Sequence, residues 1–214
     1  MAEASLSQVS NPMSLSALHS FFLKISTPPV IAVTTLASAL LLWLIQFEGG
    51  VPGVVRIDNL LRIGLPDMML TYSPGTIYQR LVQFGAEGRY AYRLFLERVD
   101  FIFPALYGLF FVSATTRGFS RLFPNRPALQ KLSLLPFAVT LFDYAENLCF
   151  LTMLRDYPHE FVSLEKIANL FTLAKWLFAL ISTALVLLAV FGLVRRAPRQ
   201  AETNSKTGAV GAFR

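Results

Sequence analysis

Long apolar stretches alternate with shorter polar ones along the chain, a pattern typical of membrane-spanning helices. The first uninterrupted stretch, residues 30–47, contains about 18 residues without a charge, which is long enough to cross a bilayer. Three further stretches follow at about residues 92–114, 132–154 and 164–194. The pattern predicts an all-α, polytopic membrane protein in which four transmembrane helices form a bundle within residues 30–194.

Shorter elements are predicted outside these spans. Residues 1–29 carry apolar positions at helical spacing, which indicates a cytoplasmic or interfacial helix that ends at a Pro-Pro pair. Between spans 1 and 2, Ser73 as a cap and Gly85 as a stop predict a short surface helix. Residues 195–214 are polar and predict a disordered tail.

Composition supports the membrane class. The chain is 54% hydrophobic and 15% charged, whereas soluble domains have about 25% charged residues. The net charge of +6 does not indicate nucleic-acid binding, because the basic residues flank apolar stretches and no nucleic-acid-binding motif is present. Cys149 is the single cysteine, which excludes an intramolecular disulfide.

The distribution of basic residues predicts the orientation. The connection at residues 115–131 has four basic residues and no acidic one, and the positive-inside rule places such a loop in the cytoplasm. With four spans, both termini then lie in the cytoplasm as well. Four arginines on the other side argue against this orientation: Arg56, Arg62, Arg89 and Arg93. The organelle is not indicated.

Polar residues interrupt the third span in the stretch LFDYAENLCF. Asp143 lies three residues before Glu146 and four before Asn147, so the three side chains share one helix face. Lys175 is placed about a third of the way along the fourth span, at a similar predicted depth. A charged residue at the bilayer centre costs about 2.5–3.5 kcal/mol, so these groups are expected to face inward and to pair.

A second polar stripe is predicted on the second span. Arg93, Glu97, Asp100, Pro104 and Tyr107 follow one another at spacings of four, three, four and three residues. Proline has no N–H group, so Pro104 leaves the carbonyl oxygen of residue 100 without its helical partner and predicts a kink beside Asp100.

Metal binding is not predicted. Di-iron sites in helical bundles use Glu-x-x-His pairs, whereas this chain has Asp-x-x-Glu and no histidine on any span. No glycine-rich phosphate loop or nucleophile elbow is present. We therefore expect neither a metal nor another cofactor.

Two of these motifs carry a resemblance to known sequences. The stretch with Asp100, Pro104 and Tyr107 matches D-x-x-x-P-x-x-Y, and the stretch with Asp143, Glu146 and Asn147 matches D-x-x-E-N. Over about residues 65–160 the chain resembles a group of small, uncharacterised four-span membrane proteins. The resemblance implies the four-span fold and the importance of these polar residues. It implies no particular activity.

Three functions are compatible with these patterns. The first, narrowly preferred from the sequence, is an accessory or assembly module in which the polar cluster holds the helices together. The second is an intramembrane acid/base enzyme, namely an isomerase, cyclase or hydrolase, that acts on a lipophilic substrate. The third is a proton-coupled carrier.

Each function assigns roles to the same residues. If the protein is an enzyme, its catalytic candidates are Asp143, Glu146 and Asp100. The remaining members of the predicted polar network are Asn147, Lys175, Tyr107, Tyr144, Glu97 and Arg93. The predicted partners are the lipid bilayer together with a membrane protein, a second copy of the chain or a lipophilic small molecule.

Overall fold

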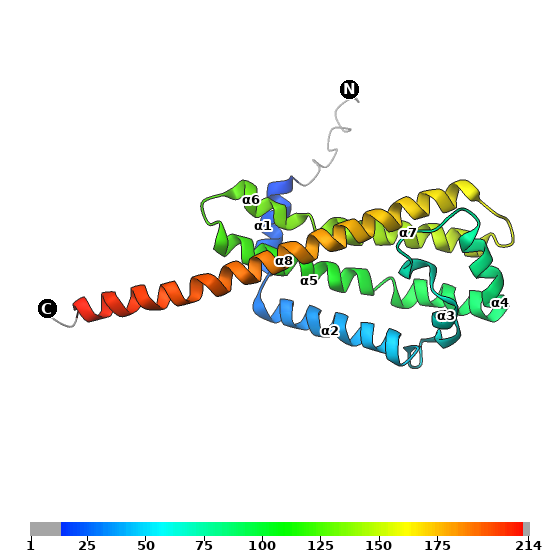
Figure 1. Cartoon of the computed structure of the whole chain (residues 1–214), viewed down its shortest axis with the longest axis horizontal. Coiled ribbons are helices and arrows are strands. Elements are labelled where there is room, and N and C mark those ends of the chain that lie inside the picture. The colour runs from blue at the N-terminus through cyan, green and yellow to red at the C-terminus, as the bar shows by residue number, and fades with distance from the viewer. Residues whose placement is uncertain (1–13, 212–214) are drawn as a thin grey trace, which may run out of the picture.

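The computed structural model describes residues 14–211 and is predominantly helical (Figure 1). Its α-helices are α1 (Leu15–Ile25), α2 (Pro28–Phe47), α3 (Asp58–Ile63), α4 (Thr76–Leu94), α5 (Phe103–Leu122), α6 (Pro127–Lys131), α7 (Phe137–Arg155) and α8 (Val162–Gly211). The antiparallel strands β1 (Gly50–Val51) and β2 (Val55–Arg56) form a small hairpin after α2. Short helical turns complete the chain: the 3₁₀ turns η1 (Pro66–Met68) and η3 (Leu132–Leu134) and the π-helical turn η2 (Phe95–Val99).

Four helical stretches within residues 14–211 are long and apolar enough to cross a membrane. They are Pro28–Phe47, Thr76–Leu122, Pro127–Arg155 and Val162–Val194. The fold is therefore all-α apart from the hairpin, and it contains four candidate spans.

The second candidate span is longer than the sequence pattern indicates. It covers 47 residues, because α4, η2 and α5 follow one another almost without interruption. The short surface helix expected before Gly85 is the first part of this stretch. At Gly85 the backbone does leave the helical conformation, with φ 65° and ψ −176°, and a positive φ of this kind favours glycine. The helix then resumes and reaches Leu94.

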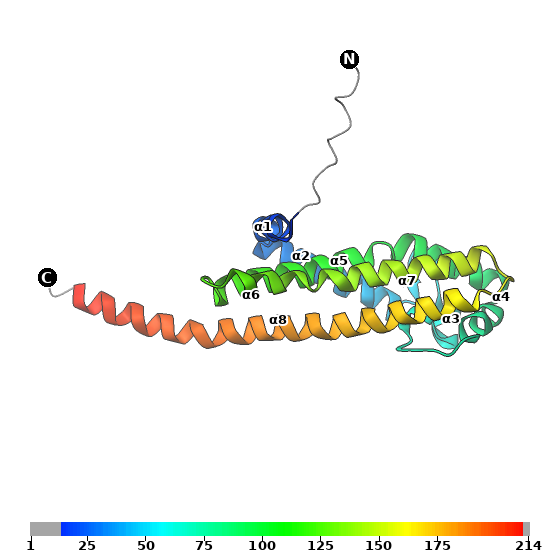
Figure 2. The same cartoon turned by 90° about the horizontal axis from the view of Figure 1, so that it is seen from above.

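Helix α5 lies at the centre of the bundle and packs against α2, α7 and α8, as the two perpendicular views show (Figures 1 and 2). Helix α7 runs beside the first part of the longer helix α8. Gly108 allows α5 to approach α7 closely, because a Cβ atom at this position would lie 1.9 Å from Thr140 Oγ1.

The two ends of the chain differ from a simple four-span pattern. Helix α1 begins after Ser14, whose Oγ accepts a hydrogen bond from the Ala17 N–H group at 3.2 Å, and it packs against α5. At the other end, α8 continues to Gly211, where the sequence pattern indicates an irregular tail from residue 195. Residues 1–13 and 212–214 of the predicted terminal segments lie outside the described residues.

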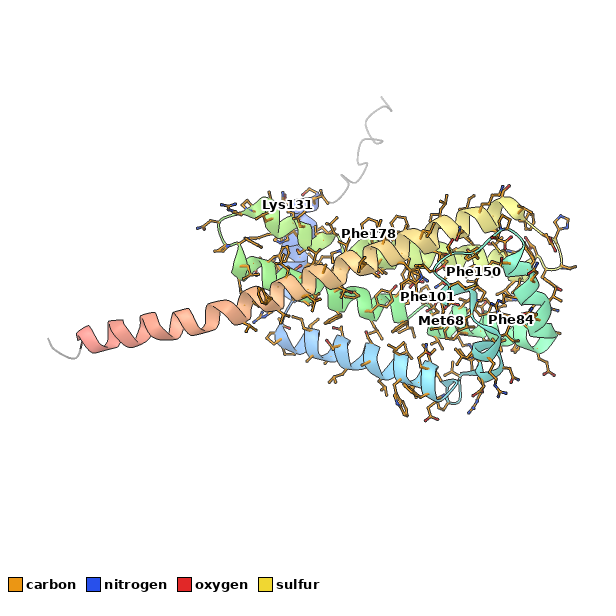
Figure 3. All side chains as sticks on the ribbon, in the orientation of Figure 1. Met68, Phe84, Phe101, Lys131, Phe150 and Phe178 are labelled. Carbon is orange, nitrogen blue, oxygen red and sulfur yellow. The ribbon has the colours of Figure 1, made fainter. Side chains whose placement is uncertain are left out.

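The apolar core is concentrated at one end of the bundle. There the connection between α2 and α4 packs with η2, the end of α7 and the start of α8, around residues such as Tyr92, Phe95, Phe150 and Met153. Figure 3 shows Phe84 and Phe150 at this end and Lys131 at the other. The apolar core therefore stabilises the end of the bundle that also carries the buried polar side chains.

Candidate functional site

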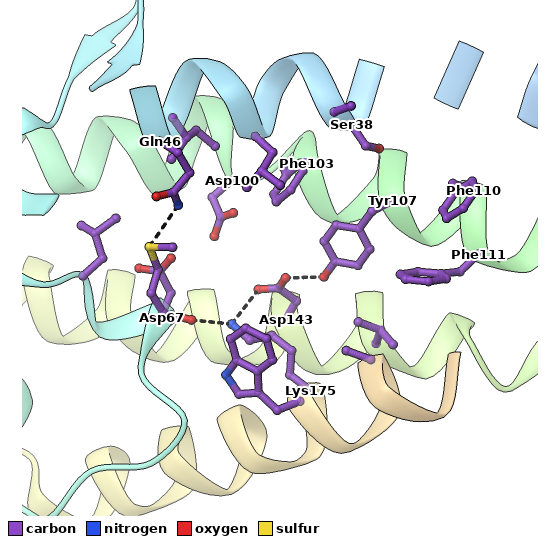
Figure 4. Close-up of a pocket in the computed structure, with 18 of the residues that line it drawn as sticks. Ser38, Gln46, Asp67, Asp100, Phe103, Tyr107, Phe110, Phe111, Asp143 and Lys175 are labelled. Atoms are coloured by element: carbon purple, nitrogen blue, oxygen red, sulfur yellow. Dashed lines mark hydrogen bonds and ion pairs between the residues drawn. The ribbon is translucent and has the colours of Figure 1, made fainter. Parts of the chain in front are cut away.

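A cavity of about 420 Å³ lies between α2 and α8, over α5 and α7 (Figure 4). Its polar lining includes three carboxyl groups and one lysine, whereas most of its wall is apolar and aromatic. The residues that line it are Thr35, Ser38, Ala39, Leu42, Ile45, Gln46, Leu65, Asp67, Met68, Phe95, Asp100, Phe103, Tyr107, Phe110, Phe111, Val139, Asp143, Lys175, Trp176 and Ala179.

Lys175 of α8 contacts polar groups of α7 and of η1. Its Nζ atom donates a hydrogen bond to the Glu146 carboxylate and another to the backbone oxygen of Asp67 at 3.0 Å. The same atom lies 3.5 Å from Asp143 Oδ1. An ammonium group has three N–H donors, and three acceptors surround this one. Lys175 is 8% exposed, so these contacts replace its hydration.

Glu146 of α7 belongs to the packed part of the network. Its side chain is fully buried and accepts hydrogen bonds from Lys175 and from the Thr172 hydroxyl. It is not among the residues that line the cavity. Glu146 therefore holds Lys175 in place from behind the cavity wall.

Asp143, one helical turn away, faces the cavity. Its Oδ2 atom accepts a hydrogen bond from the Tyr107 hydroxyl of α5. Its Oδ1 atom is buried and accepts no hydrogen bond from the described residues, although Lys175 is near. This oxygen is therefore paired with Lys175 by charge and not by a hydrogen bond.

Asp100 lies at the break between η2 and α5. The amide nitrogen of Asn147 donates to Asp100 Oδ2 at 2.8 Å and to the Asp100 backbone oxygen at 3.3 Å. That backbone oxygen is the one that Pro104 leaves without a helical partner. The break is therefore stabilised by a side chain from α7, and it holds the Asp100 carboxyl group at the cavity.

Two other side chains of α7 satisfy the same break. Tyr144 Oη donates to the backbone oxygen of Phe101 at 2.7 Å, and Thr140 Oγ1 donates to that of Pro104 at 3.0 Å. Tyr144 does not line the cavity. Its hydroxyl group contacts the backbone of the break instead.

Arg93 and Glu97 do not join this site. They pair with each other at 2.7 Å, and their side chains are 56% and 39% exposed. The stripe expected from Arg93 to Tyr107 assumes a continuous α-helix. The π-helical turn η2 and the break after it change the helical phase, so the first two members of the stripe face away from Asp100.

Asp67 is a member of the site that the span pattern does not identify. It lies in η1, in the connection between α3 and α4, and its Oδ1 atom accepts a hydrogen bond from Tyr92 Oη at 3.0 Å. Burial raises the pKa of the Asp67 carboxyl group above its usual range, against the opposing effect of the positive charge on Lys175. No periodicity could reveal this residue, because it lies outside the spans.

Polar side chains on one face of α8 hold the connection that carries Asp67. Glu165 accepts hydrogen bonds from the N–H groups of Gly75, at 2.5 Å, and Ile77, at 2.7 Å. Further along α8, Asn169 Oδ1 accepts from the Tyr72 N–H group at 3.1 Å. Trp176 Nε1 donates to the Met69 oxygen at 3.0 Å. Asp67 is thereby positioned from the same helix that carries Lys175.

The cavity reaches the lateral surface of the bundle. Leu42 of α2, Met68 of η1 and Trp176 of α8 line it and are 46%, 46% and 41% exposed. These rim residues belong to or adjoin the apolar spans, so the mouth lies along the side of the helices.

No cluster of three or more His, Cys, Asp and Glu side chains suited to a metal ion occurs between residues 14 and 211. No protein family, curated protein or solved structure matches the chain. The functional argument therefore rests on the geometry of the cavity.

Proposed function

We propose that the chain is an integral membrane protein whose four candidate spans cross the bilayer. Large apolar side chains on the outer faces of α2 and α8 support this proposal: Leu36 and Leu180 are each 69% exposed, which would be unfavourable in water over so large a surface. The basic connection between α5 and α7 supports cytoplasmic termini. The cavity then lies in the opposite half of the membrane.

We further propose that the protein is an acid/base enzyme acting on a lipophilic substrate. The observation that carries this proposal is the cavity itself, in which Asp67, Asp100 and Asp143 line, together with Lys175, a largely apolar and aromatic space that opens along the side of the bundle. Pockets of about 300–1,000 Å³ with few polar groups in apolar walls are typical of small-molecule sites. A substrate dissolved in the bilayer has direct access to such a mouth.

The chemistry assigned to the site is proton transfer. Asp143, oriented by Tyr107, and Asp100 are the proposed general acid and base, and one donates a proton to the substrate while the other accepts one. Glu146 and Lys175 are proposed as positioning residues.

The accessory-module function retains one observation in its favour. Glu146, Thr172 and Lys175 form a buried network that links α7 to α8, as expected of polar groups that hold helices together. Such packing explains the buried contacts of Glu146 behind the cavity wall. It does not explain why Asp100 and Asp143 line a cavity. The carrier function stays a prediction.

The proposed activity can be tested without a known substrate. The purified protein is incubated in lipid nanodiscs with a total lipid extract of its native membrane, in D₂O, and the lipids are analysed by mass spectrometry. Proton transfer to carbon leaves deuterium in a C–H position that survives washing with H₂O. A parallel incubation in H₂¹⁸O detects hydrolysis instead.

The expected result is one labelled lipid class with the wild type and none with Asp143→Asn or Asp100→Asn. Glu97→Gln is the matched control, because Glu97 lies on the same chain segment as Asp100 but outside the cavity. If wild type and all variants give identical lipid profiles while remaining folded, the enzyme proposal is wrong and the accessory function is favoured.

A further inference from the structure

The polar end of the cavity has many more acceptors than donors. The carboxyl groups of Asp67, Asp100 and Asp143 line the cavity and that of Glu146 lies behind its wall, whereas Lys175 supplies the one ammonium group of the lining and pairs with Asp143 and Glu146. An uncompensated charge in an apolar interior costs several kcal/mol, so the cluster favours protons or a cation that balance the excess.

Lys175 leaves little capacity to bind an anion. Its ammonium group is already surrounded by Glu146, Asp143 and the Asp67 backbone oxygen. Other side-chain nitrogen donors of the site are directed elsewhere: the Asn147 amide to Asp100, the Gln46 amide to Met68 Sδ and the Trp176 indole to the Met69 oxygen. A carboxylate or phosphate headgroup would therefore meet an excess of carboxyl groups and an ammonium group that is already paired.

Two polar atoms of residues that line the cavity are buried without a hydrogen-bond partner among the described residues. Asp143 is 5% exposed, and its Oδ1 accepts no hydrogen bond from the described residues. Ser38 Oγ, on the α2 wall of the same cavity, is also buried without a partner. A bound ammonium group would offset the charge of the Asp143 carboxylate, whose ion-pair partner Lys175 is shared with Glu146.

Aromatic rings surround this polar end. Tyr107, Phe103 and Trp176 line the cavity together with Phe110 and Phe111. The faces of such rings attract cations, most strongly where water is excluded. Figure 4 shows Asp143, Tyr107, Phe103 and Lys175 around the same space.

We infer that the cavity takes a lipophilic molecule that carries a protonated amine, with the ammonium group at Asp143 and Asp100 and the apolar body among the aromatic rings. The inference rests on the proposed small-molecule function and names the substrate class for that site. It distinguishes this class from neutral lipids and from fatty acids, which would fill the same apolar space.

Three probes of equal chain length test the inference: N,N-dimethyldodecylamine, dodecanol and dodecanoate. Binding is measured on the full chain in phosphatidylcholine nanodiscs by the emission of Trp176, in a Trp43→Phe background that removes the other tryptophan. Empty nanodiscs correct for partitioning of each probe into lipid. Thermal unfolding with each probe gives an independent readout.

The amine should bind at least about tenfold more tightly than the alcohol, which corresponds to about 1.4 kcal/mol, and the carboxylate should bind more weakly still. Asp143→Asn and, separately, Asp100→Asn should each reduce this preference, and Glu97→Gln should leave it unchanged. Equal binding of the amine and the alcohol, or preferred binding of the carboxylate, would overturn the inference. Two variants are used so that misfolding of one leaves the test intact.

The outcomes of this test and of the deuterium experiment are separable. Amine binding without deuterium transfer would retain the ligand class and remove the chemistry. Deuterium transfer without preference for the amine would retain the chemistry and remove the ligand class.

Discussion

Lys175 is a buried cation that pairs with two buried carboxylates, and Glu146 is the more deeply buried of the two. Removing one member of a buried ion pair leaves the other without compensation and typically costs about 3–5 kcal/mol. Glu146→Ala should therefore lower the free energy of unfolding by about 3 kcal/mol, with the remaining contact to Asp143 limiting the loss. Titration with SDS in mixed micelles measures this quantity.

The double variant Glu146→Ala/Lys175→Met separates charge from packing. It should be more destabilised than Glu146→Ala alone, because the buried Asp143 carboxylate then loses its ammonium partner as well. Glu97→Ala is the matched surface control and should cost less than about 1 kcal/mol, since its pair with Arg93 is exposed. A double variant at least as stable as the single one would contradict the assignment of Lys175 as the group that compensates Asp143.

Asp67 predicts a pH dependence of stability. Burial raises the pKa of this carboxyl group in the folded protein, so the folded state holds its proton at pH values at which the unfolded state has released it. The stability contributed by the protonated group is present below the usual carboxyl pKa of about 4 and is lost as the pH rises through the higher folded value.

The wild type should therefore lose stability relative to Asp67→Asn as the pH is raised from about 4. The amide oxygen of the variant can still accept the hydrogen bond from Tyr92, which makes the comparison close to isosteric. Melting temperatures across a pH series measure the difference. Parallel curves for the two proteins would show that Asp67 titrates alike in both states.

At the scale of the elements, Glu165 caps the start of α4 from another helix. Its carboxylate accepts hydrogen bonds from the Gly75 and Ile77 N–H groups, a role that a helix usually gives to a nearby residue. Glu165→Ala should destabilise the protein by about 1–2 kcal/mol and speed limited proteolysis within residues 70–76. Glu160→Ala, at an exposed position just before α8, should change neither rate nor stability.

The elements also show which parts of the fold the sequence pattern can predict. Apolar length is a local property, so the all-α class and four stretches able to cross a membrane followed from it. The extension of the second stretch back over residues 76–91 did not, because this segment is too polar to be recognised as part of a span. Their helix is stabilised instead by packing around Tyr92 and Phe95, which no window of sequence displays.

The site, too, has one part that the sequence pattern predicts and another that it does not. Helical spacing brought Asp143, Glu146 and Asn147 to one face, and Pro104 indicated the free carbonyl group that Asn147 now occupies. Spacing could not reveal that η2 shifts the phase of the second stripe. Nor could it bring in Asp67, whose place depends on contacts between segments about 100 residues apart.

At the scale of the whole molecule, the proposed orientation is open to a direct test. Cys149 is the single cysteine, so a Cys149→Ala background accepts one new cysteine at a time. Ser73→Cys and Asn125→Cys place it at exposed positions in the connections on the two sides of the bundle. In intact cells an impermeant maleimide should label position 73 alone, if the protein resides in the plasma membrane.

Permeabilised cells are the control, in which both positions should react. Labelling of position 125 alone in intact cells would reverse the orientation and place the termini outside. Labelling of both positions without permeabilisation would contradict the four-span arrangement.

Lys175 also restricts which substitutions this sequence can accept during evolution. Lys175 is in contact with Glu146 and Asp143 at once, so loss of its charge affects two helices in a single step. A substitution at position 175 should then be tolerated only with accompanying substitutions at 143 or 146. In related chains these three positions are expected to vary as a set, whereas exposed Arg93 and Glu97 drift independently of them.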